Sequence, residues 1–229
     1  AAILVEPVPA NMGVVPPKDG FLEMLRRAAD DSGALLIFDE VITGFRVARG
    51  GAQELYGIDP DLTILGKVLG GGLPAAAFAG PREAMERVAP AGDVYQAGTL
   101  SGNPLATAAA RATLRKLNDA AYGQLSATTE TLASGLREAA AAANAKVQVQ
   151  GVPGLLTVFF SELPVNSYLG AAKSDTEAYA AWCRGLLARG VYPPPSQFEA
   201  WFPSLAHSVE DVRRTVEAAA DAFAEIAPR

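Results

Sequence analysis

One lysine of this chain differs from the others in the residues that surround it. Lys67 follows an apolar run at residues 62–66 and precedes the glycine-rich segment VLGGGLP, whereas the other four lysines lie in loops or helical stretches that water reaches easily. Glycines at a strand end let a ligand or another backbone segment come close. Partial burial there would disfavour the ammonium form, as an imine-forming lysine needs. We therefore predict that Lys67 is a nucleophilic amine.

An acidic residue supplies what a pyridine cofactor would need. Asp39 lies near the end of ALLIFDEV, the apolar run at residues 34–41. A pyridine ring is an electron sink only while its nitrogen stays protonated, and a carboxylate bonded to that nitrogen keeps it so. Val41 lies two residues on, so on a strand it points to the same side as Asp39 and would pack flat against the ring. Plain core packing is the alternative for Val41.

Two segments offer themselves as phosphate sites. The glycine-rich run after Lys67 lacks the spacing and the terminal Lys-Ser/Thr of a P-loop, so it matches that motif poorly. Gly98, Thr99 and Ser101 in QAGTLSGNP combine hydroxyls with flexible backbone N–H groups just before a helix start, which is a natural anion site. Helix capping alone explains Ser101 equally well.

Other polar residues have simpler explanations. Glu6 and Glu40 also fall at the ends of predicted strands, where ligands of open α/β sheets gather, but strand tips are often merely solvated. His207, the only histidine, is expected to be structural, beside the cap of the last helix. Cys183, beside Trp182 in a helical stretch, is expected in the core.

Composition excludes several classes of protein. The formal net charge of -6, with scattered acids, argues against a basic groove for nucleic acid. No apolar run is long enough to span a bilayer, so no membrane partner is expected. With one cysteine, no intrachain disulfide can form, which fits a cytoplasmic location. No metal site is predicted.

The order of elements favours an α/β fold with a mostly parallel sheet. Apolar runs predict strands at residues 1–8, 34–41, 62–66 and 75–80, with a helix at 21–31. Helices are then expected at 103–116, capped by Ser101 or Asn103, and at 125–143. Later residues predict an antiparallel pair at 147–149 and 155–160, a helix at 175–189, a short strand beginning at 191–192, and a final helix Val209–Ile226 capped by Ser208.

The kinds of element that the sequence predicts differ between the two halves of the chain. We expect residues 1–120 to form the C-terminal part of a large sheet domain and residues 121–229 to form a smaller α+β domain. The chain begins with a strand-like run at residues 1–8, and no turn, helix cap or polar segment precedes this run. We therefore expect it to begin inside a larger fold, although an ordinary first strand is the alternative.

Several motifs together resemble one known family. The segments EPVPANMG, LLIFDEVITGFR, LGKVLGGGLP and QAGTLSGNP, in this order, resemble the class III aminotransferases, which are pyridoxal-phosphate enzymes of fold type I. The segments TGFR, LSGNPLA and PSQFEAWFPSLAH are most similar to the glutamate-1-semialdehyde 2,1-aminomutase subgroup. The resemblance covers essentially the whole chain.

The resemblance implies a role for each candidate. Lys67 would form the Schiff base with the cofactor and shuttle protons, Asp39 would pair with the pyridinium nitrogen, and Val41 would back the ring. The remaining residues are placed around these three by the same resemblance: Asn11 near the cofactor's 3-hydroxyl with Glu6 behind it, Gly98 and Thr99 at the phosphate of the neighbouring subunit's cofactor, and Glu199 at the substrate entrance.

The reaction implied is an internal amino transfer in tetrapyrrole biosynthesis. In the subgroup, the pyridoxamine form of the cofactor donates its amine to glutamate 1-semialdehyde and recovers the other amine, which yields 5-aminolevulinate without net oxidation. A homodimer with a shared site is implied. An aminotransferase of the same family acting on an ω-amine or amino acid is the alternative.

The length departs from the family pattern, because such chains are about twice as long as this one. The N-terminal half would carry further cofactor contacts, a gating loop and an arginine for the substrate carboxylate. We therefore expect this chain to be a piece of such an enzyme or one part of a split enzyme. As it stands it would be weakly active, or a catalytically inert fragment.

Overall fold

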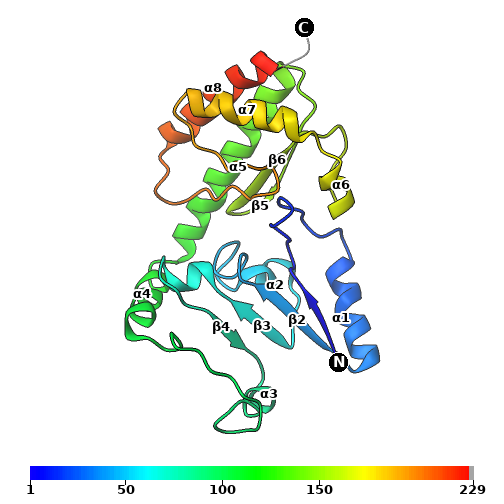
Figure 1. Cartoon of the computed structure of the whole chain (residues 1–229), viewed down its shortest axis with the longest axis vertical. Helices are drawn as coiled ribbons and strands as arrows, with labels where there is room; N and C mark the ends of the chain where they lie inside the picture. Colours follow the sequence, from blue (N-terminus) through cyan, green and yellow to red (C-terminus); the bar gives the residue numbers. More distant parts are fainter. Residues whose placement is uncertain (227–229) are drawn as a thin grey trace. The chain divides into compact units, whose positions relative to one another are not determined.

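The computed structural model describes residues 1–226, which form two compact units (Figure 1). Among the described residues, unit 1 comprises Ala1–Pro7 and Pro17–Asp119, and unit 2 comprises Val8–Pro16 and residues 120–226. The short segment Val8–Pro16 thus belongs with the second half of the chain, although the sequence prediction groups it with the first. Within the described residues, no helix is long and apolar enough to cross a membrane.

Unit 1 contains a four-stranded mixed sheet with the order β1-β2-β3-β4. The strands β1 (Ala2–Val5), β2 (Leu35–Glu40) and β3 (Leu62–Leu65) are parallel, and β4 (Ala77–Ala79) is antiparallel to β3. Each of the four predicted strands is therefore present, in a shorter form. The mostly parallel α/β sheet that the sequence predicts is confirmed.

One face of this sheet is covered by helices. Helix α1 (Phe21–Ser32) inserts Leu22 and Ala29 against Leu36 and Phe38 of β2, and all four side chains are buried. Glycines in the left-handed conformation flank the helix at both ends, which is the usual device at a C-terminus. The short helix α2 (Gly51–Tyr56) lies on the same face, where the Gln53 side chain bonds to residues of β2 and β3.

The opposite face of the sheet is open within the described chain. Residues paired across neighbouring strands share a face, and Leu4, Leu35 and Phe78 occupy this one. Their exposed fractions are 62%, 42% and 45%. Parallel sheets are usually covered on both faces, so this apolar surface is unusual for a complete layer structure.

The remaining helices of unit 1 follow the sheet. The 3-10 helix η1 (Lys67–Gly70) begins directly after β3, and α3 (Arg82–Met85) is a single turn. Helix α4 (Pro104–Leu114) begins at the predicted cap Asn103, whose side chain accepts the N–H of Ala106 at 2.8 Å. Pro104 stands in the first turn, where its missing N–H costs nothing.

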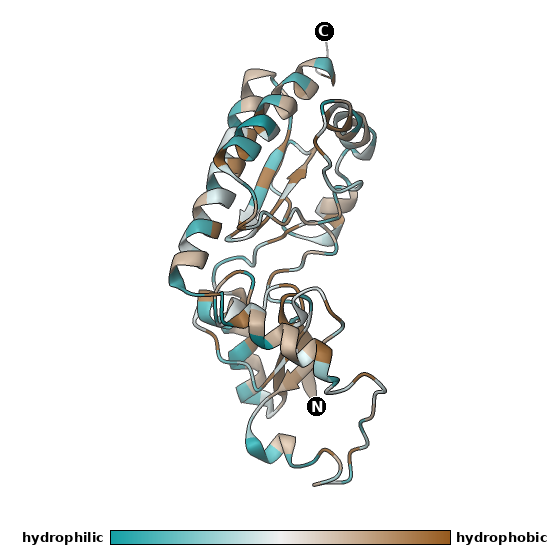
Figure 2. Cartoon of the chain, turned by 90° about the vertical axis from the view of Figure 1, so that its left-hand side faces the viewer, coloured by the Kyte–Doolittle hydropathy of each residue, from teal (hydrophilic) through white to brown (hydrophobic). Residues whose placement is uncertain are grey.

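Unit 2 packs three long helices around a two-stranded antiparallel sheet. The helices are α5 (Asp119–Ala142), α7 (Thr176–Ala188) and α8 (Val209–Ile226), and Figure 2 shows hydrophilic and hydrophobic residues side by side on the helices of this unit. The strands β5 (Gln148–Val152) and β6 (Leu155–Phe159) form the predicted hairpin, and a short helix α6 (Tyr168–Ala172) follows. The core joins apolar side chains of all three helices and both strands, including Leu136, Val149, Leu156, Trp182 and Phe223.

One predicted strand is wrong. Residues 191–192 do not form a strand, because the prolines at 193–195 have no N–H to donate to a ladder. Instead, the Pro194 carbonyl accepts the Tyr179 hydroxyl at 2.7 Å. An isolated bridge between Leu156 and Trp201 lies beside the hairpin in place of a third strand.

Candidate active site

The tip of β2 holds the predicted acidic residue in a defined direction. Asp39 Oδ1 accepts the backbone N–H of Val41 at 3.0 Å, and both side chains are half-buried. Asp39 pairs with Ile64 of β3, and Val5 of β1 pairs with Phe38. Glu6, which follows Val5, therefore emerges at the level of Asp39, at the carboxyl end of the sheet.

Lys67 emerges at the same end of the sheet, two residues after the last β2–β3 pair, Glu40 with Leu65. Its backbone has a positive φ of 41°, which is uncommon outside glycine and turns the chain sharply into η1. The predicted partial burial is wrong, since the Lys67 side chain is exposed within the described chain. The preceding strand β3 is itself only half-buried along its length, so its residues do not enclose the lysine side chain.

A glycine brings Lys67 and Val41 together. A methyl group placed on Gly66 would lie 3.2 Å from Val41 Cγ1, closer than ordinary van der Waals contact. The Val41 side chain therefore packs directly on the backbone that precedes Lys67. Of the sequence candidates, the structure thus gathers Glu6, Asp39, Val41 and Lys67 at one sheet end.

Helix α4 supports the turn that carries Lys67. Gly71 caps η1 with φ 59°, and an added methyl would lie 2.1 Å from Thr113 Oγ1 and 3.2 Å from the Ala109 carbonyl oxygen. The glycine-rich run therefore allows the close backbone approach that its sequence predicts. It serves helix packing, because both contacting residues belong to α4.

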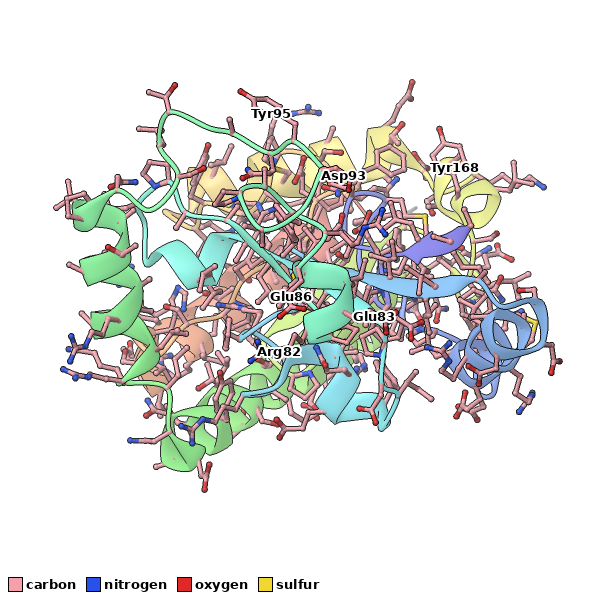
Figure 3. All side chains as sticks on the ribbon, turned by 90° about the horizontal axis from the view of Figure 1, so that it is seen from below. Arg82, Glu83, Glu86, Asp93, Tyr95 and Tyr168 are labelled. Atoms are coloured by element: carbon pink, nitrogen blue, oxygen red, sulfur yellow. The ribbon has the colours of Figure 1, made fainter. Side chains whose placement is uncertain are left out.

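The predicted phosphate segment lies on an exposed loop of unit 1. Gly98 and Thr99 are both exposed, and the Ser101 N–H donates to the Gly98 carbonyl at 3.0 Å. Tyr95, in the same loop, is 85% exposed and lies on the outside of the molecule in Figure 3. Hydrogen bonds within this segment include the bond from Asn103 Nδ2 to the Leu100 carbonyl at 2.9 Å.

Two predicted site residues, Asn11 and Glu199, belong to unit 2. Both side chains are exposed, but their backbone segments are held together by one buried residue of β6. Thr157 Oγ1 accepts the Val14 N–H at 2.9 Å and donates to the Glu199 carbonyl at 3.2 Å. The Gly13 N–H also donates to the Phe198 carbonyl at 2.7 Å. The two segments therefore form one surface of unit 2.

Glu40, for which the sequence pattern indicates no role beyond a strand tip, is the most completely bonded acid in this region. Its side chain is fully buried, and its two oxygens accept hydrogen bonds from Thr43, Ala52 and Gln53. A local pattern cannot reveal this role, because two of these partners lie 12 and 13 residues farther along the chain. The glycine at position 51 is the one local signal.

The remaining candidates are structural. His207 Nδ1 accepts the Ser204 N–H at 2.9 Å beside the start of α8, where Ser208 Oγ accepts the Asp211 N–H at 3.1 Å. Cys183 is buried in the core of unit 2, and this burial raises its pKa. Within residues 1–226, no group of three or more His, Cys, Asp or Glu side chains is arranged to hold a metal ion.

Curated relatives match almost the whole chain. It is 57% identical over 224 residues to a glutamate-1-semialdehyde 2,1-aminomutase of Pelotomaculum thermopropionicum, which covers 97% of this chain and 52% of the relative. A protein of the same name from Thermomicrobium roseum is 55% identical over 228 residues, covering 99% of this chain and 53% of the relative. The chain thus spans about half the length of the curated relatives it matches.

Solved structures share the fold. An omega-transaminase from Sphaerobacter thermophilus superposes with a TM-score of 0.91 at 31% identity, over 98% of this chain and 52% of its own. A glutamate-1-semialdehyde aminomutase from Pseudomonas aeruginosa, in complex with PMP, gives a TM-score of 0.87 at 27% identity over the same shares. The sequence model of the class III aminotransferases matches residues 1–222. The chain therefore belongs to the class III aminotransferase family.

Proposed function

We propose that Lys67, Asp39 and Val41 form one wall of a pyridoxal-phosphate site. The observation that carries this proposal is the meeting of a lysine, a carboxylate and an apolar side chain at the carboxyl end of one sheet, with Val41 packed on Gly66 next to Lys67. The donor set suits the cofactor, because it combines an amine, an acceptor for a pyridinium N–H and an apolar surface for a ring.

Each residue has a task that its position supports. Asp39, held by the Val41 N–H, would accept a hydrogen bond from the ring nitrogen and keep that nitrogen protonated. Val41 would exclude water from one ring face. Lys67 would hold and release the proton that moves between substrate carbons, and its exposed Nζ is free to reach them. Bound pyridoxal phosphate supplies the electron sink for this chemistry.

The reaction we propose for the whole protein is the conversion of glutamate 1-semialdehyde to 5-aminolevulinate, for tetrapyrrole biosynthesis. The identity of 57% and 55% to two aminomutases, over nearly all of this chain, supports that substrate. Exchange of an amine and a carbonyl within one molecule needs no external oxidant. Asn11 and Glu6 would adjoin the cofactor's 3-hydroxyl, and Glu199 would lie at the substrate entrance.

A homodimer with a shared site is part of the proposal. Gly98 and Thr99 would bind the phosphate of the partner's cofactor, which is consistent with their exposure on a loop away from their own sheet end. Backbone N–H groups and the Thr99 hydroxyl suit a phosphate. A cytoplasmic location, where the lone Cys183 would stay reduced, completes the proposal.

A second candidate function is an aminotransferase acting on an ω-amine or amino acid, since the omega-transaminase superposes with a TM-score of 0.91. An assay of the whole protein separates the two. Formation of 5-aminolevulinate from glutamate 1-semialdehyde without an added acceptor supports the aminomutase. A strict requirement for a keto acid would contradict it.

The chain itself can be tested by cofactor capture. After addition of pyridoxal phosphate and reduction with borohydride, we expect a stable mass increase on the peptide that contains Lys67. The Lys67→Ala variant should lose the visible absorption band and the labelled peptide. Lys116→Ala is the matched control, because Lys116 is also exposed in unit 1 but lies far along the sequence from the sheet end. Equal labelling of both lysines would sink the assignment and favour an inert fragment.

A further inference from the structure

We propose that Glu40 is a positioning residue, which fixes the direction of Asp39 and Val41 by tying the tip of β2 to the start of α2. The inference rests on the proposed cofactor site. It concerns a residue that does not face that site, because neighbouring residues of a strand point to opposite sides.

Four hydrogen bonds converge on the buried Glu40 carboxyl group. Oε2 accepts the Ala52 N–H at 2.6 Å and the Thr43 hydroxyl at 2.9 Å. Oε1 accepts the Gln53 N–H at 3.1 Å and its side-chain Nε2 at 3.0 Å. All four of these partners donate to Glu40, which matches a carboxylate, since that group only accepts. A glutamine in its place would set its own amide N–H groups against some of these donors.

The backbone around α2 is shaped to admit this carboxylate. Gly51 has φ 73°, and a methyl group added there would lie 2.1 Å from Glu40 Oε2. No side chain of the preceding residues caps α2, so Glu40 supplies the acceptor for its first N–H groups. The glycine at position 51, with its positive φ, therefore leaves room for the Glu40 carboxylate.

The hydrogen bonds of Glu40 restrict the two residues that flank it in sequence, Asp39 and Val41. Glu40 pairs with Leu65, and Gln53 also reaches Thr63 Oγ1 at 3.4 Å, so the bonds join β2, α2 and β3. If the Glu40 side chain cannot leave its helix-covered face, Asp39 must keep pointing to the opposite side. The 3.0 Å bond from the Val41 N–H to Asp39 Oδ1 then stays formed.

The Val41 amide offers a readout that needs no cofactor, because its N–H donates to Asp39. In hydrogen exchange of the cofactor-free chain, we expect Glu40→Gln to lower the protection of Ala52 and Gln53 by about tenfold or more. We also expect the protection of Val41 to fall. Glu54→Gln is the matched control, since Glu54 is an exposed acid of the same helix whose side chain accepts the Gly50 N–H. It should leave Val41 unchanged.

A second experiment compares bound pyridoxal phosphate in three variants. Visible circular dichroism per trapped cofactor should change in Glu40→Gln in the same direction as in Asp39→Asn, and stay as in the unsubstituted chain in Glu54→Gln. If the unsubstituted chain captures no cofactor, the proposed site fails, and the Val41 exchange still decides the role of Glu40.

An effect confined to Ala52 and Gln53 would overturn the inference, because Glu40 would then merely cap α2. Should Glu40→Gln fail to fold, Gln53→Leu removes one of the four donors while keeping the backbone bonds. It should lower Val41 protection in the same direction, by a smaller factor. Unchanged Val41 protection in that variant would likewise contradict the inference.

Discussion

The two units differ in how completely they bury their own apolar surface. In unit 2, the Trp182 ring stacks on the rings of Phe223 and Trp201, with centroids 4.8 and 5.8 Å apart. Side chains from three helices and two strands surround this cluster. Unit 1 has a small core on one face of its sheet and exposes Leu4, Leu35 and Phe78 on the other. The candidate active-site residues at the sheet end belong to the unit with the thinner core. The proposed cofactor site therefore belongs to the unit that buries less of its apolar surface.

The two tryptophans make this contrast measurable. Trp182 and Trp201 are the only ones in the chain, and both belong to unit 2. Tryptophan fluorescence therefore follows unit 2, whereas hydrogen exchange of α1 and β2 amides follows unit 1. We expect unit 2 to withstand more urea than unit 1.

The largest effect is expected from opening the aromatic core of unit 2. Trp182→Ala should lower the free energy of unfolding of unit 2 by about 3–5 kcal/mol, because it leaves a large cavity. It also removes the Nε1 bond to the Ala219 carbonyl. Urea unfolding followed by Trp201 fluorescence measures this loss. Leu187→Ala, at a partly exposed position of the same helix, should cost much less. A comparable loss in both variants would contradict an enclosed core.

An intermediate effect is expected in unit 1, where two neighbouring leucines face opposite sides of β2. Leu36→Ala should lower the stability of unit 1 by about 2–4 kcal/mol, since Leu36 is fully buried under α1. Leu35→Ala, on the open face, should change it by about 0.5 kcal/mol or less. Amide exchange of α1 measures both. A large, concentration-dependent cost of Leu35→Ala would show that another copy covers the open face.

The smallest effect concerns a carboxylate that joins α1 to the sheet. The Leu36 N–H and Arg26 lower the pKa of Asp61, with bonds of 2.7 and 2.9 Å. Asp61→Asn should therefore cost about 1 kcal/mol in unit 1.

The sign of the pH effect follows from this lowered pKa. The stabilisation by Asp61 is complete above its unfolded-state pKa of about 3.9 and is lost as the pH falls through the lower folded-state value. We expect the acid loss of α1 protection to be shallower in Asp61→Asn than in the unsubstituted chain. Unit 2, followed by fluorescence, serves as the internal control. Identical acid profiles of unit 1 would contradict this role.

Local patterns predicted the elements well where the chemistry is local. Apolar runs marked all four strands of unit 1, and Asn103 with Pro104 marked the start of α4. The hairpin was predicted from the turn between two apolar segments, and the last helix from its amphipathic spacing. The candidate residues at the sheet end were found because parallel strands bring their carboxyl ends to one edge.

Features that depend on distant partners escaped prediction. Helix α2 has weak local signals, and its first N–H groups are bonded by Glu40, 12 residues earlier. The exposure of Lys67 depends on which segments cover the open sheet end, and no pattern around position 67 contains that information. The placement of Val14 depends on the hydroxyl of Thr157, far along the chain.

That last contact has a consequence for the timing of folding during synthesis. Val14 precedes Thr157 by 143 residues, and Gly13 must fit against Phe159 and the backbone of Gln197. At roughly 5–20 residues per second, a ribosome that has made Val14 needs on the order of 10 seconds more to make β6, which contains Thr157. The segment Val8–Pro16 therefore leaves the exit tunnel early but finds its place late. Until β6 has been made, this segment is exposed and largely apolar, and chaperones and proteases can reach it.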